Sequence, residues 1–181
     1  MGKINARKGK VFAMLAILLI AGGTVLAKGR PRSLQQQIRH ELVTLPYYGV
    51  FDNLAFKVDG GTVTLYGQVV RPTTKSDAEY RVARLNGVNR VINNIEVLPL
   101  SSFDDSIRQR TYRAVFRSGG LYRYALGANP SIHIVVDRGH VTLEGVVANK
   151  MDSQLAYMAA SGVPGVFSVT NHLRVERGRA Y

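Results

Sequence analysis

The sequence predicts an α+β fold: two tandem αββαβ domains, each a three-stranded sheet with two helices on one face, after an N-terminal export signal or anchor helix. Three observations support this prediction. One half of the chain repeats the other at a fixed offset, both halves alternate apolar and polar residues with the period of strands, and a basic segment followed by an apolar run opens the chain. A length of 181 residues suits one ordinary domain or two small ones, so the repeat decides between them.

The amino terminus has the charge pattern of a targeting segment. Residues 1–10 are basic without an acidic residue, and residues 11–27 are uncharged, mostly apolar and end in small side chains. This pattern predicts that residues 1–27 are a signal peptide cleaved after Ala27, or a retained membrane anchor formed by residues 11–27. A glycine pair favours cleavage, whereas positive charges in the basic linker 28–32 oppose it. Both interpretations predict an exported protein of the periplasm or cell envelope.

An internal repeat defines the two domains. Residues 58–97 align with residues 136–175 without a gap, at an offset of 78, and 14 of the 40 pairs are identical. The identities concentrate at glycine and apolar positions, which determine backbone conformation and core packing. The predicted units are a first domain at 33–100, a second domain at 101–176 and a tail at 177–181.

Each half predicts the same order of elements. Ser33 with Gln36, and Ser102 with Asp105, are candidate capping pairs at the start of a helix. Alternating apolar positions then predict two strands joined by a short turn, a second helix and a last strand. The ranges are strands 54–58 and 63–69, helix 74–85 and strand 91–97 in the first half, and strands 132–136 and 141–147, helix 150–161 and strand 169–175 in the second.

Two pairs of equivalent glycines mark special backbone positions. Gly61 and Gly139 close the turn between the first two strands, where we expect a positive φ. Gly67 and Gly145 lie within a strand, where glycine is normally unfavourable. We attribute these two to close approach of the second helix of each domain to the sheet, with a backbone ligand site as the less favoured alternative.

These motifs resemble those of a known family. Residues 58–69 with 87–97, and again 136–147 with 165–175, are similar to the BON (bacterial OsmY and nodulation) domain. The resemblance covers nearly all of the chain after residue 32, and a double domain behind an export signal is similar to the periplasmic osmotic-stress protein for which the family is named. It implies an αββαβ fold, an envelope location, no catalysis and a role in contacting phospholipid membranes. The segment 103–131 is longer than its counterpart in the first half, so a family-wide role need not transfer to it unchanged.

The composition argues against most catalytic chemistry. The chain has no cysteine, which excludes thiol catalysis, disulfides and cysteine-ligated metal, and its four histidines fall in different predicted elements. We therefore expect no enzyme activity, no catalytic residues, no metal site and no cofactor. The formal net charge of +12 falls to +8 when residues 1–27 are removed, and an exported protein rarely meets nucleic acid, so we expect no nucleic-acid partner.

The first helix of the second domain carries the candidate binding site. Helical spacing predicts that Phe103, Ile107 and Thr111 face the core, with an arginine stripe beside them and the pair Tyr112 and Phe116 pointing away from it. Arginine pairs with lipid phosphates, and aromatic rings settle at headgroup depth. The predicted lipid- or partner-binding residues are Arg110, Tyr112, Arg113, Phe116, Arg117, Tyr122, Arg123 and Tyr124.

Two questions stay open at the level of sequence. Tyr112 and Phe116 could instead pack against the first domain, which would remove the apolar anchor of the proposed lipid site. The expected partner is an anionic phospholipid surface or, as the alternative, an envelope protein bound by a periplasmic adaptor or chaperone-like module. The sequence does not indicate an oligomeric state.

Overall fold

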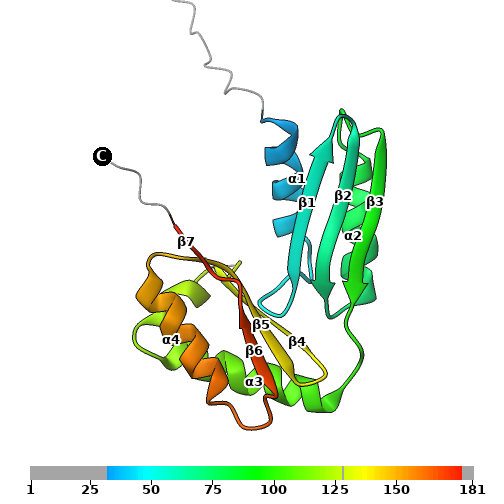
Figure 1. Ribbon diagram of the computed structural model, residues 1–181. Helices are drawn as coiled ribbons and strands as arrows, with labels where there is room; N and C mark the ends of the chain where they lie inside the picture. Colours follow the sequence, from blue (N-terminus) through cyan, green and yellow to red (C-terminus); the bar gives the residue numbers. More distant parts are fainter. Residues whose placement is uncertain (1–31, 128, 177–181) are drawn as a thin grey trace, which may run out of the picture. The chain divides into compact units, whose positions relative to one another are not determined.

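The computed structural model describes residues 32–127 and 129–176, which belong to one compact unit (Figure 1). The predicted signal or anchor at 1–27, most of the linker 28–32 and the tail 177–181 lie outside the described residues. The first domain contains α1 (Leu34–Val43), β1 (Asn53–Asp59), β2 (Thr62–Val69), α2 (Pro72–Ala83) and β3 (Arg90–Val97). The second contains α3 (Ser102–Arg117), the 3-10 helix η1 (Leu121–Ala125), β4 (Ile132–Asp137), β5 (His140–Val147), α4 (Lys150–Ser161), β6 (Ser168–Asn171) and β7 (Arg174–Val175).

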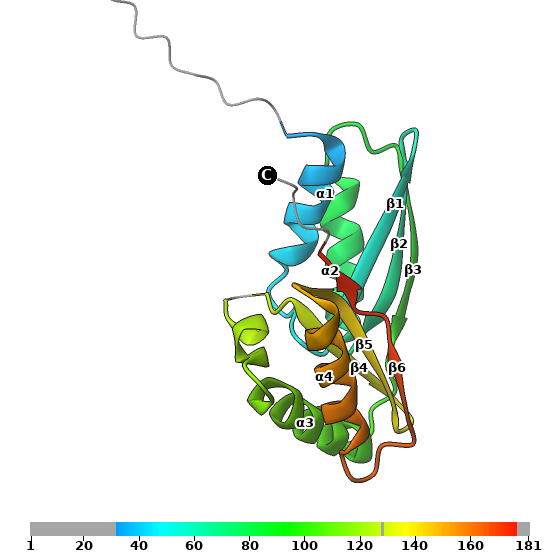
Figure 2. The ribbon, with the colours of Figure 1, turned by 60° about the vertical axis from the view of Figure 1, so that its left-hand side comes forward.

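Both domains have the predicted αββαβ order. In the first sheet β2 is central, antiparallel to β1 and parallel to β3; in the second, β5 is central, antiparallel to β4 and parallel to β6 and β7. The two helices of each domain cover one face of its sheet (Figure 2). The single predicted strand 169–175 is divided into β6 and β7. The side chain of Asn171 accepts from the backbone N–H of Leu173 and donates to the carbonyl of Ser153 in α4, as Asn93 does with Ile95 and Lys75 beside the continuous β3.

Each domain has its own apolar core, built from the alternating strand positions and the inner faces of the helices. The fully buried side chains include Ile38, Leu65 and Ile95 in the first core and Ile107, Ile134 and Leu143 in the second. The capping box predicted at Ser33 and Gln36 is present. α3 is capped one residue earlier than predicted, since Ser101 rather than Ser102 accepts from the backbone N–H of Asp104.

The strand glycines are explained by neighbouring backbone rather than by a helix. Gly67 and Gly145 have φ values of +112° and +120°. A Cβ on Gly67 would collide with the carbonyl oxygen of Asn53, and a Cβ on Gly145 with that of Ser131. The expectation that an approaching helix requires these glycines is therefore wrong, because the obstacle is the adjacent strand or the residue that leads into it.

The turn glycines follow the prediction in one copy only. Gly139 has the expected positive φ of +80°, with the ring of Phe167 lying over it. In the first copy the positive φ falls on Gly60, at +57°, and not on Gly61. Gly61 is instead covered by the side chain of Asn89, the residue equivalent to Phe167, which leaves no room for a Cβ.

The loop between α1 and β1 packs against the second domain. Val50 and Phe51 contact the second core, and the carbonyl oxygen of Val50 accepts from the backbone N–H of Ile134 at 2.7 Å. The ring of Tyr48 lies 5.4 Å from that of His133, centre to centre, and His133 Nδ1 lies 3.2 Å from the carbonyl oxygen of Gly49. These contacts place first-domain side chains over the edge of β4.

Candidate functional site

α3 presents an exposed basic stripe. Arg110, Arg113 and Arg117 lie with Phe103 within an arc of about 80° on a helix of 3.6 residues per turn. Arg113 and Arg117 are exposed and Arg110 is half-buried. The core-facing arc contains instead Ile107, with Asp104, Arg108, Thr111 and Val115. The predicted arginine stripe is thus at the surface, as expected.

Phe103 is exposed rather than part of the core, which corrects the prediction. Its side chain is 46% accessible because the first turn of α3 is anchored by its neighbour Asp104, which is buried. The Asp104 carboxylate accepts from the backbone N–H groups of Arg138 and Gly139, at 2.9 and 2.8 Å, and so ties α3 to the turn between β4 and β5. Helical spacing alone could not show that a carboxylate would take the inward position.

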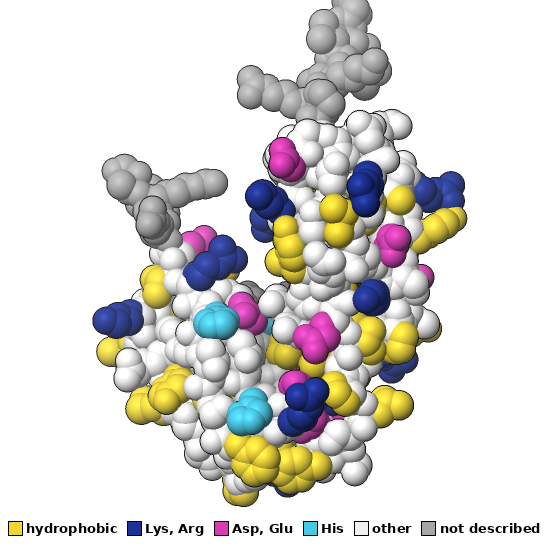
Figure 3. Space-filling model, turned by 45° about the vertical axis from the view of Figure 1, so that its right-hand side comes forward, with side chains coloured by type: hydrophobic (Ala, Val, Ile, Leu, Met, Phe, Trp, Pro, Cys, Tyr) yellow, Lys and Arg dark blue, Asp and Glu magenta, His cyan; other side chains and the backbone are white. Residues whose placement is uncertain are grey.

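Phe103 belongs to an exposed aromatic pair. Its ring centre lies 6.0 Å from that of Phe167, in the loop before β6, and Phe167 is 69% accessible. The guanidinium of Arg110 and the ring of Phe103 both lie against Gly165. Hydrophobic side chains gather at this end of the second domain, next to a histidine and a basic side chain (Figure 3). The arginine stripe therefore begins at an apolar tip that the sequence analysis did not identify.

Two of the predicted aromatic anchors, Phe116 and Tyr112, are packed against other residues. Phe116 is 7% accessible and packs edge-to-face on Tyr112, with 4.8 Å between ring centres. Tyr112 is half-buried against Phe51 of the first domain, at 6.2 Å. The expectation that both rings point away from the core is wrong for Phe116, which belongs to the second core. The alternative of packing against the first domain holds for Tyr112.

Tyr124 and Arg123 form part of a hydrogen-bonded cluster. The buried Tyr124 hydroxyl donates to Asp152 at 2.5 Å and accepts from the backbone N–H of Ala148 at 2.8 Å. Arg123 forms an ion pair with the same carboxylate. The hydrogen bond from Tyr124, supported by Arg123, lowers the pKa of Asp152. These contacts join η1 to the start of α4, so Tyr124 has a structural role, whereas Tyr122 is exposed.

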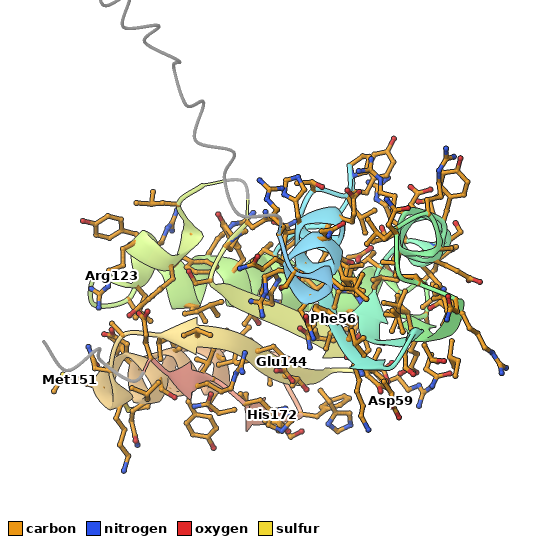
Figure 4. All side chains as sticks on the ribbon, turned by 90° about the horizontal axis from the view of Figure 1, so that it is seen from above. Phe56, Asp59, Arg123, Glu144, Met151 and His172 are labelled. Carbon is orange, nitrogen blue, oxygen red and sulfur yellow. The ribbon has the colours of Figure 1, made fainter. Side chains whose placement is uncertain are left out.

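The titratable side chains of His172, His133 and Tyr48 contact other parts of the fold. His172 lies 2.8 Å from Glu144 across the second sheet (Figure 4). Burial lowers the pKa of His133 and raises the pKa of Tyr48 to about 12. Among residues 32–127 and 129–176, no three His, Cys, Asp or Glu side chains are grouped so as to hold a metal ion. In the same part of the chain, no helix is long and apolar enough to cross a bilayer.

The comparisons with known proteins establish the family. The BON domain model matches residues 32–99 and again residues 104–177. The chain therefore belongs to the BON domain family and contains two tandem copies of the domain, as the repeat predicted. The family is non-catalytic.

Similar solved structures are distant. The C-terminal domain of CdsD, a structural protein of the Type III secretion system of Chlamydia trachomatis, is 14% identical with a TM-score of 0.34, over 80% of this chain and 98% of that one. A second CdsD structure is 15% identical with a TM-score of 0.29, over 80% of this chain and 93% of that one. No curated protein matches the chain. Similarities this weak do not bear on its function.

Proposed function

We propose that this protein is a non-enzymatic cell-envelope protein that binds anionic phospholipid surfaces through its second BON domain. The observation that carries the proposal is the exposed stripe of α3, where Arg113 and Arg117 follow the half-buried Arg110 and the exposed ring of Phe103. A basic helix face that ends in exposed aromatic rings suits the boundary between headgroups and acyl chains. Membership of a family linked to phospholipid binding supports the same assignment.

The revised site differs from the predicted set in its apolar anchors. Phe103 and Phe167 take the place of the buried Phe116 and Tyr124 and the half-buried Tyr112, while the exposed Tyr122 of the predicted set is kept. Arg123 is partly neutralised by Asp152. Each basic residue near an anionic surface contributes about 1 kcal/mol, so the three arginines of the α3 stripe support reversible adsorption that weakens with salt.

The cellular location belongs to the same proposal. A basic segment followed by the apolar run 11–27 supports export to the periplasm or envelope, with either cleavage after Ala27 or retention as an anchor. A retained anchor would hold the second domain at the membrane, whereas a cleaved form would depend on the surface of the second domain for binding. Mass spectrometry of the mature amino terminus distinguishes the two.

Charge reversal tests the proposed lipid site. Flotation with phosphatidylglycerol vesicles should recover residues 28–181, a segment that contains the whole compact unit and lacks the apolar run, which would itself bind lipid. The double variant Arg113→Glu/Arg117→Glu should lose about 100-fold or more in apparent affinity, because two attractions become two repulsions. The matched control is Arg39→Glu/Arg84→Glu, the same charge change on exposed arginines of the first domain. The complete chain is floated in parallel.

The outcomes separate lipid binding from the alternative function. Binding that needs anionic lipid, weakens with salt and survives the control change supports the proposal. Equal losses in both double variants would show a non-specific effect of net charge and contradict the assignment to α3. Absence of binding to any vesicle would favour the protein-binding adaptor, for which the same surface would serve.

A further inference from the structure

α4 carries an exposed stripe without any charged group. Met151 and Met158 are 79% and 54% accessible, and seven residues apart they lie within about 20° of each other around the helix. Gln154 and Ser161 extend the stripe and are also exposed. Exposed apolar residues that are scattered singly over a surface need no explanation, whereas residues that share one face of a helix indicate an interaction surface.

The first domain provides an internal comparison, because α2 is the equivalent helix 78 residues earlier. α2 has charged side chains at four positions where α4 has uncharged ones. The pairs are Lys75 and Ser153, Asp77 and Leu155, Glu79 and Tyr157, and Arg81 and Ala159. The exposed Met151 and Met158 correspond to Thr73 and Tyr80. These four positions flank the Met151–Met158 stripe and are not part of it, and the α2 counterparts of the stripe itself are also uncharged. The two stripes therefore differ in their side chains, methionine in α4 against threonine and tyrosine in α2, and in the charges beside them.

The uncharged stripe lies beside the arginines of α3. α3 and α4 pack against each other, with Leu155 against Gly119 at one end. At the other end Arg110 and Phe103 of α3 lie against Gly165, just after α4. Arg123 pairs with Asp152 in the first turn of α4, and Met151 is the residue before Asp152. Figure 4 shows Met151 at the periphery of this end of the helix. The helix layer of the second domain therefore combines the basic stripe of α3 with the uncharged Met151–Met158 stripe of α4.

We infer that α4 is a second membrane-contacting helix, with Met151 and Met158 at the depth of the lipid glycerol and upper acyl chains. This inference rests on the proposed function and specifies how the surface is bound. The arginines of α3 select an anionic bilayer by charge, and the uncharged stripe of α4 adds apolar area without opposing charge. Unbranched methionine side chains adapt to a disordered surface such as lipid.

Site-specific fluorescence tests the depth of α4. Because the chain has no cysteine, Met151→Cys and Met158→Cys each give one labelling position for an environment-sensitive NBD fluorophore. On phosphatidylglycerol vesicles the emission should shift to the blue and be quenched by nitroxide on the upper acyl chain. Thr73→Cys and Tyr80→Cys are the matched controls, since they occupy the same positions on α2, and their emission should not change.

Affinity gives a second, independent measurement. Met151→Ser/Met158→Ser removes apolar area without adding charge, and should weaken vesicle binding by about 10-fold or more. Thr73→Ser/Tyr80→Ser, the equivalent change on α2, should leave binding unchanged. The substituted methionines are exposed, so thermal unfolding should be unaltered and a loss of binding cannot be assigned to misfolding.

The two proposals fail in distinguishable ways. If the protein floats with anionic vesicles while the α4 labels stay unshifted and unquenched and the serine variant binds normally, the inference about α4 is wrong and the proposed function stands. If the parent protein does not bind vesicles, both are wrong. If labels on α2 shift as much as those on α4, the orientation on the membrane is not the one inferred.

Discussion

At the scale of single residues, Gly145 has a backbone role that no other residue can fill. Its φ of +120° and the carbonyl oxygen of Ser131 leave no room for a Cβ. We predict that Gly145→Ala lowers the free energy of unfolding by about 2 kcal/mol or more, from backbone strain and displacement of the strand. Urea unfolding followed by circular dichroism measures the change.

Gly49→Ala is the matched control for this prediction. Nothing lies within 4 Å of a Cβ placed on Gly49, and its φ is not in the left-handed region. Its effect should stay within about 0.5 kcal/mol. A loss at Gly145 no larger than the loss at Gly49 would show that the adjacent strand tolerates a side chain there.

At the scale of elements, the loop between α1 and β1 makes the contact with β4 sensitive to acid. The pKa of His133 is lowered because its ring is buried, against the smaller opposing effects of the backbone at Gly49 and of the Asp52 and Glu144 carboxylates. The neutral ring is thus favoured in the folded state. Stability from this site is complete above the unfolded pKa of about 6.5 and is lost as the pH falls through the folded pKa.

A substitution isolates this pH dependence. The free energy of unfolding of the parent protein should fall between about pH 7 and pH 5, and His133→Gln should flatten that slope, because glutamine does not titrate. Tyr48, which faces the ring with a pKa of about 12, stays neutral over this range. His40→Gln, at an exposed position in α1, is the control and should keep the parent slope. An unchanged slope in His133→Gln would assign the acid sensitivity to other groups.

The elements themselves follow from the sequence pattern, but the exposure of individual side chains does not. Alternation of apolar residues and the repeat were enough to predict the order αββαβ, because these patterns are local. The half-burial of Tyr112 depends on Phe51, which lies in another domain, and Phe116 is buried in the second core. The exposure of Phe103 depends on Asp104 binding the β4–β5 turn. Such long-range contacts carry no signal in helical periodicity.

Part of the surface that we propose for α4 was detectable from the sequence and was missed. Aligning α2 with α4 at the offset of 78 residues shows that Lys75, Asp77, Glu79 and Arg81 have no charged counterparts. Identities between the copies indicated what the fold requires. Under our proposal, the differences between them mark the surface by which the second copy binds membranes.

At the scale of the whole molecule, the two BON domains share a fold and differ in surface chemistry. The second combines a basic α3, an uncharged α4 stripe and the Phe103–Phe167 pair, whereas the helices of the first carry mixed charges. We therefore expect the second domain to bind the bilayer, while the first contributes the loop that covers Tyr112 and supports β4.

Paramagnetic broadening of amide NMR signals tests this division most directly. Residues 28–181 are bound to phosphatidylglycerol bicelles that contain a nitroxide-labelled lipid. The account predicts strong broadening along α3, along α4 and at Phe167, and none in α1 or α2. Broadening centred on α1 and α2, or equal broadening in both domains, would contradict the claim that the helix face of the second domain is the membrane-binding surface.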